Sequence, residues 1–168
     1  MRITDTHIYF WGSWMSNWIP RDCKIYYEHP TRNELYCFNT AEQLFMWFKA
    51  LYFNDEEKAW EIVITGQDPK VAKNLGRQVR GYVEEKWALV REEMMYKAVM
   101  AKFKSDKELK DKLLATGDKI LVEGTPFDGI WGVKIKWDDD QILDEKNWRG
   151  QNLLGKVLMD VREELKVA

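Results

Sequence analysis

The fold of this chain is decided at Thr40-Ala41-Glu42-Gln43-Leu44-Phe45-Met46-Trp47-Phe48-Lys49-Ala50-Leu51-Tyr52. Thr40 and Gln43 have the spacing of a capping box, in which the threonine caps the first turn of a helix and the glutamine reaches back to it. The residues that follow are apolar on almost every side, which is typical of a helix enclosed by other elements. We therefore predict a central helix that begins after Thr40.

The residues before this helix predict strands and turns. Three short runs are rich in the β-branched and aromatic residues that favour strands, namely 7–11, 24–28 and 34–38. The last two runs are separated by His29-Pro30-Thr31-Arg32-Asn33, which suits a hairpin loop.

The residues after the central helix predict mainly helices. Capping residues, a proline at a first helical position and apolar residues at helical spacing indicate five of them. Two begin near 55 and at 69, and three span about 82–103, 105–115 and 153–165. Strands are expected at 119–123 and 131–137. The prediction is one compact α+β domain over residues 1–168, predominantly α-helical with a few short strands.

Charge and hydropathy exclude several classes of protein. The chain has 168 residues, with 26 basic and 28 acidic side chains and a formal net charge of -2. This balance provides no overall basic field for nucleic acid, although it permits a local basic patch. The apolar stretches are far shorter than the roughly 18 residues of a membrane span. Because Met1-Arg2-Ile3-Thr4-Asp5 does not begin a signal peptide, we expect a cytoplasmic protein with no membrane partner.

The rare residues argue against metal and cofactor chemistry. Two histidines and two cysteines, Cys23 and Cys37, form no zinc motif. The sequence also contains no glycine-rich dinucleotide motif and no P-loop. We therefore expect no metal and no cofactor, and any reaction would depend on carboxylates, amides, basic side chains and aromatic rings.

Two carboxylates interrupt patterns that otherwise indicate burial. Glu42 lies in the first turn of the most apolar helix, where the helix dipole favours a negative charge. It is either an accessory of the cap or a rigid carboxylate at the mouth of a pocket. Asp128 lies in a loop with two glycines, which ordinary turn chemistry explains. The same loop is also a candidate site, because Trp131 can present a flat face and Gly132 can let a ligand approach the backbone.

A third candidate is Trp148-Arg149-Gly150-Gln151-Asn152, which precedes the last helix. Asn152 suits an N-cap, and the same helix N-terminus beside Arg149 can hold an anion such as a phosphate. The fourth is a set of cations on the predicted helices, of which Lys49 alone lies on the apolar helix: Lys49, Lys73, Arg77, Arg80 and Arg91. Together these features suggest a pocket for a phosphorylated, flat-ringed ligand. Paired carboxylates also suit the cleavage of a glycosidic bond.

The order of these motifs resembles the NADAR (YbiA-like) family along nearly the whole chain. The matching segments are 14–18, Ala41-Glu42-Gln43 with Lys49-Ala50, 72–77, Trp87 with Arg91, 114–117, Pro126-Phe127-Asp128-Gly129-Ile130-Trp131-Gly132 and 148–156. The chain departs from many members at Gln43 and Phe45, where His or Tyr is common, and at 133–136, where a glycine-rich turn is common.

The resemblance implies an N-glycosidase that hydrolyses the bond between ribose C1′ and a nitrogen. The implied substrates are phosphorylated N-ribosides such as the ribosylated pyrimidine phosphates of early riboflavin synthesis, with the base and ribose 5-phosphate as products. Two alternatives stay open. One is an ADP-ribosyl hydrolase that removes ADP-ribose from guanine in nucleic acid, and the other is an ADP-ribose-binding module without catalysis.

The resemblance also assigns roles to residues. Glu42 and Asp128 are the expected catalytic carboxylates. Seven residues are expected to bind substrate, by stacking, close backbone approach or contacts with ribose and phosphate: Asn17, Lys49, Arg77, Trp131, Gly132, Arg149 and Asn152.

Seven of the nine tryptophans divide into two predicted groups. Trp47, Trp60 and Trp87 fall on apolar helical faces and are expected to pack in the core. The others of interest lie in loops or at the ends of elements and are expected to line the pocket: Trp14, Trp18, Trp131 and Trp148.

Overall fold

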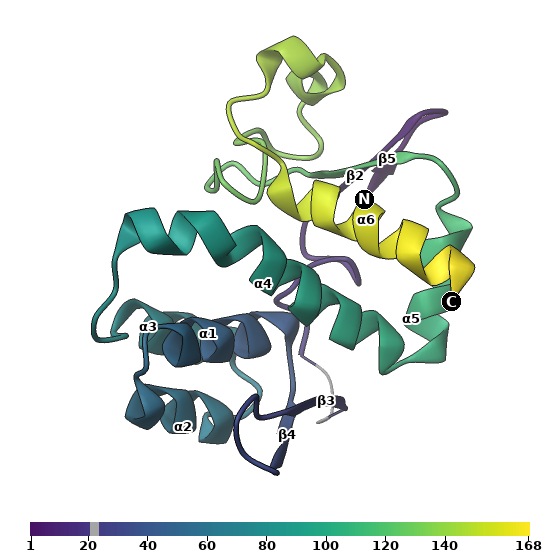
Figure 1. Cartoon of the computed structure of the whole chain (residues 1–168). Coiled ribbons are helices and arrows are strands. Elements are labelled where there is room, and N and C mark those ends of the chain that lie inside the picture. The colour runs from purple at the N-terminus through teal and green to yellow at the C-terminus, as the bar shows by residue number, and fades with distance from the viewer. Residues whose placement is uncertain (21–23) are drawn as a thin grey trace. The chain divides into compact units, whose positions relative to one another are not determined.

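The computed structural model describes residues 1–20 and 24–168, so that Cys23 lies outside the described residues (Figure 1). It divides into two compact units. We call Asn17–Lys107 the helical unit, and Met1–Ser16 together with Glu108–Ala168 the sheet unit. Each is described by itself.

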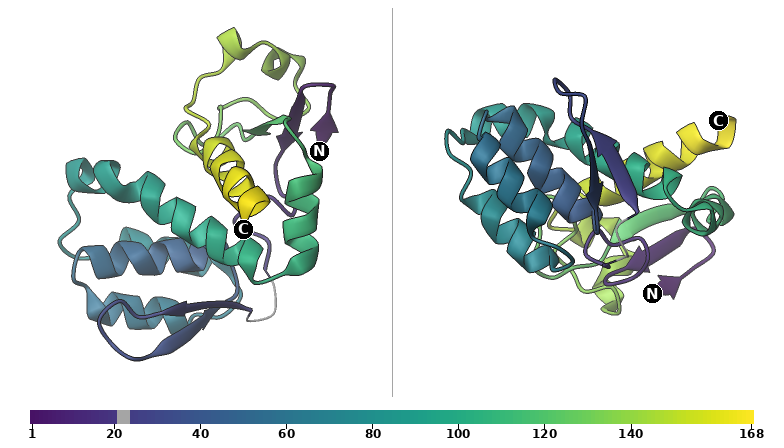
Figure 2. Two further views of the ribbon diagram at one scale, coloured as in Figure 1. Left: turned by 45° about the vertical axis from the view of Figure 1, so that its right-hand side comes forward. Right: turned by 90° about the horizontal axis from the view of Figure 1, so that it is seen from below.

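The helical unit contains one hairpin and four helices. The hairpin pairs β3 (Ile25–Glu28) with β4 (Leu35–Phe38) in antiparallel fashion, with Ile25 opposite Phe38. The helices are α1 (Ala41–Tyr52), α2 (Glu56–Ile64), α3 (Pro69–Arg77) and α4 (Glu84–Lys104). Helix α1 packs against the other three, which lie around it in Figures 1 and 2. The predicted central helix is confirmed.

Aromatic rings fill the space around α1. Trp47 is 1% exposed and lies 5.2 Å from Phe38 of the hairpin, centroid to centroid. On the side toward α4, Phe45 lies 5.3 Å from Trp87. Such ring pairs add to the burial of large apolar surfaces, which is why this helix needs no polar face.

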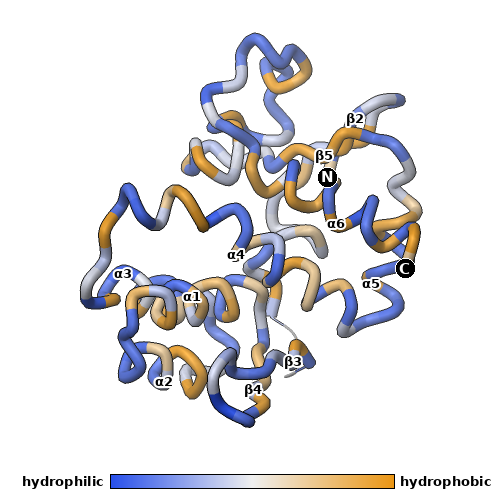
Figure 3. The backbone as a smooth tube through the Cα atoms, in the orientation of Figure 1, coloured by the Kyte–Doolittle hydropathy of each residue, from blue (hydrophilic) through white to orange (hydrophobic). Residues whose placement is uncertain are grey.

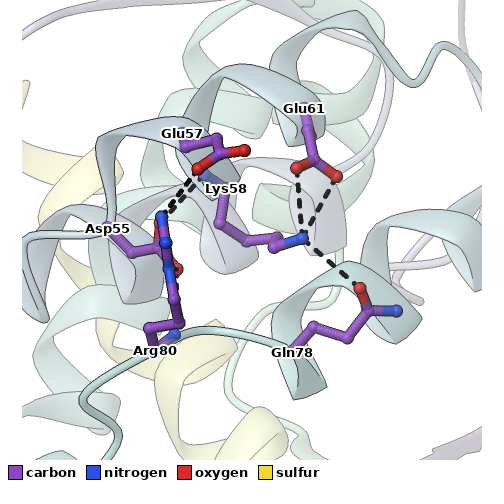
Figure 4. Close-up of polar contacts among 6 residues, drawn as sticks. All are labelled: Asp55, Glu57, Lys58, Glu61, Gln78 and Arg80. Atoms are coloured by element: carbon purple, nitrogen blue, oxygen red, sulfur yellow. Dashed lines mark hydrogen bonds and ion pairs between the residues drawn. The ribbon is translucent and has the colours of Figure 1, made fainter.

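The buried carboxylate of Asp55 connects the start of helix α2 to the segment between α3 and α4 through hydrogen bonds. Asp55 caps α2 by accepting a hydrogen bond from the backbone N–H of Lys58. It also accepts hydrogen bonds from the backbone N–H and the guanidinium of Arg80, and Arg80 in turn pairs with Glu57 (Figure 4). These contacts hold the pKa of Asp55 down at about 2, chiefly through the hydrogen bond with the Arg80 side chain.

The sheet unit brings together both ends of the chain. Its sheet has the order β1 (Arg2–Ile3), β2 (His7–Phe10) and β5 (Ile120–Glu123), with β1 antiparallel and β5 parallel to β2. Helix α6 (Leu153–Val167) packs against β5, and α5 (Lys107–Ala115) precedes that strand.

Two short 3-10 helices complete this unit. They are Asp140–Leu143 and Glu145–Asn147, in a segment that Figure 3 shows as mostly hydrophilic with a short hydrophobic stretch. Ile142, in the first of these helices, is fully buried in a small core with Tyr9 and Val122.

Most of the predicted elements are confirmed, and so is the α+β class with helices dominating and short strands. The strand predicted at 131–137 is wrong, although its side chains alternate between buried and exposed in strand fashion. Lys134 has a φ of 58°, in the left-handed region, which interrupts an extended backbone. The segment instead makes two isolated backbone hydrogen bonds near the end of β5. The N–H of Val133 donates to Glu123 O, and the N–H of Trp137 donates to Gly124 O. The expectation of a single domain over 1–168 stays a prediction.

One of the tryptophans assigned to the core differs from the prediction. Trp60 is 55% exposed, so its expected place in the core is wrong, whereas Trp47 and Trp87 are buried as predicted. Trp148 packs against the small core of the sheet unit and donates its indole N–H to Ile142 O at 2.8 Å. Trp148 therefore has a packing role, and its expected place in the pocket wall stays a prediction.

Candidate active site

Glu42 is held in the first turn of α1 and is only 7% exposed. Thr40 caps the helix by accepting a hydrogen bond from the backbone N–H of Gln43 at 3.0 Å. The N–H of Glu42 itself donates to the carbonyl of Asn17 at 3.2 Å. The backbone that carries this carboxylate is therefore fixed on both sides.

Gln43 has the spacing of a capping box, but its side chain reaches past Thr40 to the residue before it. Its side-chain oxygen accepts the N–H of Asn39 at 2.8 Å, and its side-chain nitrogen donates to the carbonyls of Ile62 and Val63. Because Gln43 is 1% exposed, water cannot replace these hydrogen bonds if they break. Gln43 thus links the first turn of α1 to the end of α2 and positions the neighbouring Glu42.

Lys49 lies on the same helix two turns after Glu42 and shares an electrostatic environment with it. Burial lowers the pKa of the Lys49 ammonium, and the nearby charge of Arg77 lowers it further. The carboxylates of Glu42 and Glu84 act in the opposite direction and favour the charged form. Lys49 is thus a partly desolvated cation near two carboxylates. An anionic group of a ligand could take the place of one carboxylate beside it.

Two residues that sequence reasoning missed hold Lys49 from the other side. The Lys49 ammonium lies 4.5 Å from the centre of the Tyr82 ring, and the Tyr82 hydroxyl donates a hydrogen bond to Glu84. Burial and this bond raise the pKa of Tyr82 to about 12, so it stays neutral at physiological pH. Glu84 also pairs with Arg91 at 3.3 Å. No local sequence signal marks these contacts, because they depend on how α4 packs on α1.

Arg77 ends α3 and is exposed, with one guanidinium N–H directed to Asn74 at 3.3 Å. Its neighbour Gly76 packs directly on α1, where an added Cβ would lie 2.0 Å from the sulfur of Met46. This close approach brings Arg77 near enough to Lys49 to affect its pKa.

Asn17 is the polar residue in this group with an unused acceptor. It is 6% exposed and donates from its amide nitrogen to the sulfur of Met95 at 3.1 Å. Among the described residues, none donates to its side-chain oxygen, which is buried. A buried acceptor without a donor is costly, so this oxygen suits a hydroxyl or a water brought by a ligand.

Asp128 organises the loop that contains it. One carboxylate oxygen accepts the N–H of Ile130 at 2.8 Å and the N–H of Trp131 at 2.9 Å. Asp128 therefore has the turn role that its loop suggested, and the turn uses one of its two carboxylate oxygens. Trp131 is half-buried at the end of this turn.

Glycines pack this loop against the start of α6. An added Cβ on Gly132 would lie 2.3 Å from a methyl group of Thr125, and one on Gly150 would lie 2.2 Å from Gly132 O. Gly132 therefore allows protein backbone to approach, which is a packing role in addition to the ligand approach expected for it.

The N-terminus of α6 is already occupied by this loop. The N–H groups of Leu153 and Leu154 donate to the carbonyls of Ile130 and Trp131, at 3.2 and 3.1 Å. An anion site at these two groups, which the sequence allows, is therefore wrong. The expected side-chain cap by Asn152 is also absent from the described hydrogen bonds.

Asn152 instead uses its side chain to pair with β5. Its oxygen accepts the N–H of Glu123 at 2.9 Å and its nitrogen donates to Leu121 O at 2.9 Å. Its φ of 52° is the left-handed conformation that asparagine tolerates better than most residues. Arg149, in the segment before it, is exposed.

The predicted site residues thus fall into two groups. The helical unit carries Asn17, Glu42, Lys49 and Arg77, and the sheet unit carries Asp128, Trp131, Gly132, Arg149 and Asn152. Within residues 1–20 and 24–168, no group of three or more His, Cys, Asp or Glu is placed to hold a metal ion. In the same part of the chain, no helix is both long and apolar enough to cross a membrane.

The chain is similar to known proteins over most of its length. A model of the NADAR domain matches residues 9–166. The chain is 34% identical over 169 residues to N-glycosidase R617 of Acanthamoeba polyphaga mimivirus, covering 96% of this chain and 97% of that protein. It is 37% identical over 121 residues to N-glycosidase YbiA of Shigella boydii serotype 4 (strain Sb227), covering 72% and 68%.

A solved structure shows the same fold. The NMR structure of the Escherichia coli protein YbiA superposes with a TM-score of 0.72 and 30% sequence identity, covering 99% of this chain and 88% of that one. These likenesses define the class of the protein as a YbiA-like N-glycosidase. The chain belongs to the NADAR domain family. The predicted family and the prediction of an enzyme are confirmed.

Proposed function

We propose that the protein hydrolyses the ribose C1′–N bond of phosphorylated N-ribosides, such as ribosylated pyrimidine phosphates of early riboflavin synthesis. The observation that carries the proposal is the buried Glu42 on a fixed helical turn, with Lys49 and Arg77 in its electrostatic surroundings. The phosphate of such a substrate matches the cations Lys49 and Arg77. The positive charge that develops at C1′ matches the carboxylate of Glu42.

Glu42 is the proposed essential carboxylate. Cleavage of an N-glycosidic bond leaves positive charge at C1′, and a rigid carboxylate stabilises that charge more in the transition state than in the ground state. The attacking water loses a proton, adds its oxygen to C1′, and the C1′–N bond breaks as the leaving nitrogen takes up a proton. Glu42 can accept the proton from water, and the unpaired oxygen of Asn17 can orient that water or a ribose hydroxyl.

Lys49 and Arg77 are the proposed phosphate contacts. The charge that Lys49 carries is disfavoured by burial, and a bound phosphate would relieve that penalty by adding negative charge nearby. Arg77 is exposed and offers planar donors suited to a phosphate.

Asp128 and Trp131 are proposed to act on the ribose and the base. Asp128 has one carboxylate oxygen engaged by the turn, and the other oxygen would orient ribose hydroxyls or share in proton transfer. Trp131 would stack on the base or the sugar face. Arg149 and Asn152 stay expected substrate contacts, with the reservation that both polar atoms of the Asn152 side chain already bind β5.

The test is Glu42→Gln, assayed by mass for release of the free base from a ribosylated pyrimidine phosphate. We expect kcat to fall by about 100-fold or more, since proton transfer by a placed side chain contributes roughly that much, with a much smaller change in KM. Glu85→Gln, an exposed carboxylate at the start of α4, is the matched control and should keep full turnover.

Wild-type turnover by a folded Glu42→Gln protein would exclude Glu42 from the reaction. The same assay with an ADP-ribosylated oligonucleotide distinguishes the metabolite substrate from the alternative of ADP-ribosyl removal from guanine. Release of guanine-containing nucleic acid without release of pyrimidine would favour that alternative.

A further inference from the structure

The helical unit has a second feature that the reaction does not use, a groove of about 620 Å³ between β3 and the second half of α4. The residues that matter for its chemistry are Lys24, Tyr26, Tyr96, Lys97, Met100 and Lys104. Most of them are exposed or only partly covered, so the groove is open along its length. Glu42 and the other members of its charge group are not among the residues lining it.

The charge of the groove has one sign. Three lysines line it, and none of its described lining residues is acidic, although the chain as a whole has a net charge of -2. Lys97 pairs with Glu93 at 3.3 Å, and the two side chains are 42% and 64% exposed. An exposed pair of this kind is weak and is readily exchanged for another anion.

Exposed aromatic surface accompanies this charge. Tyr26 is 58% exposed, whereas its neighbour Tyr27 packs its ring 4.9 Å from Phe48. Successive residues of a strand point to opposite faces, so the hairpin packs the ring of Tyr27 against α1 and exposes that of Tyr26. Tyr96 contributes a second, half-covered ring from α4.

We propose that this groove binds single-stranded nucleic acid. A strand of this kind offers phosphates for the lysines and base faces for the tyrosines, and this combination is how single strands are bound without sequence preference. Lys97 and Lys104 lie two helical turns apart, about 10 Å along α4, so they can contact different phosphates of one strand. An acidic peptide would satisfy the lysines but would not stack on the exposed ring of Tyr26.

The test is fluorescence anisotropy with a short labelled single-stranded oligonucleotide at low salt. Lys24→Gln/Lys97→Gln/Lys104→Gln should weaken binding about tenfold or more, and should make the dependence of log K on log salt shallower by up to about 2, since each neutralised phosphate of a single strand contributes about 0.7. Tyr26→Ala should weaken binding about tenfold through lost stacking.

The matched control removes the same charge elsewhere, with Lys70→Gln/Lys112→Gln/Lys146→Gln, and should bind like the wild type. The proposal fails if the wild-type protein does not bind the oligonucleotide at low salt. It also fails if the control weakens binding as much as the groove variant, or if an acidic peptide displaces the strand at equal concentration.

Binding and turnover can fail separately, because the groove does not include Glu42. Glu42→Gln should bind the oligonucleotide normally, and the groove variant should keep wild-type turnover of a small riboside. If the triple variant does not fold, as circular dichroism would show, Tyr26→Ala decides the matter alone, since an exposed ring contributes little to the core.

Discussion

Asp128 illustrates how one side chain can serve structure and chemistry together. Its carboxylate closes a turn through two backbone N–H groups, at 2.8 and 2.9 Å, and the family resemblance gives the same residue a part in the reaction. An asparagine can keep the accepting oxygen but not the charge, whereas an alanine keeps neither. The two substitutions therefore separate the two roles.

For Asp128→Asn we expect the free energy of unfolding to change by less than about 1 kcal/mol, because the two bonds to the loop backbone persist. The kcat should nevertheless fall by about 100-fold if the charge acts in the reaction. For Asp128→Ala we expect a loss of about 1–2 kcal/mol in stability as well. Urea unfolding and the base-release assay measure the two effects. Full activity in Asp128→Asn would leave this residue with its turn role alone.

Asp55 is the second residue whose environment makes a quantitative prediction. Its pKa is lowered from 3.8 to about 2, and the side chain is almost fully buried. A lowered pKa means that the charged form stabilises the fold at pH above about 4, and that this stabilisation is lost as the pH falls through about 2. The shift corresponds to about 2 kcal/mol.

Asp55→Asn should accordingly lower the free energy of unfolding by about 2 kcal/mol at neutral pH. The difference from the wild type should shrink as the pH is lowered from about 4 to about 2, because the wild type then loses its charge as well. Urea unfolding across this pH range is the measurement. A difference that does not depend on pH would contradict the ion-pair explanation and point to the lost cap alone.

At the scale of elements, helices are placed by what their termini contact. Helix α1 begins where Thr40 caps it and Gln43 links it to α2. Helix α6 begins where its first N–H groups bond to the loop at Ile130 and Trp131. Its glycine, Gly155, lies against β5, where an added Cβ would be 2.0 Å from the carbonyl of Leu121. Helix placement here depends on close backbone approach.

Gly155→Ala tests this close approach. In an exposed helix the change would stabilise by up to about 1 kcal/mol, but here the methyl group meets a backbone carbonyl that cannot turn aside. We expect a net loss of about 2 kcal/mol from overpacking. Lys156→Ala, at the next and exposed position, is the control and should change stability little. Thermal unfolding measures both, and a stabilised Gly155→Ala protein would show that α6 can move away from β5.

At the scale of the whole molecule, the two expected catalytic carboxylates belong to different units, Glu42 to the helical unit and Asp128 to the sheet unit. Kinetics can ask whether they serve one reaction. Residues that act as a unit in catalysis lose activity non-additively. We expect Glu42→Gln/Asp128→Asn to be little slower than the slower of the two single variants. Multiplication of the two single losses, measured as kcat/KM, would show that the residues act independently.

Much of the fold followed from short-range patterns. Caps such as Thr40 and Asp68, the proline that begins α3 and the apolar faces of α1 and α4 act within one or two helical turns, so a single sequence reveals them. The order of the motifs was also sufficient to indicate the NADAR family and its N-glycosidase class. Glu42 and its cap belong to this part, because its position in a first turn is a local property.

Tertiary structure alone decided what several polar groups bind. The pattern Val133-Lys134-Ile135-Lys136 alternates like a strand, yet Lys134 adopts a left-handed conformation and the segment bonds to the end of β5. Asn152 is a residue type that favours N-caps, yet its side chain forms hydrogen bonds with β5. The ring of Tyr82, in the segment before α4, contacts the ammonium of Lys49 on α1. The sequence determined the elements because their hydrogen bonds close over a few residues, and the structure decided these contacts because they form between segments far apart in the chain.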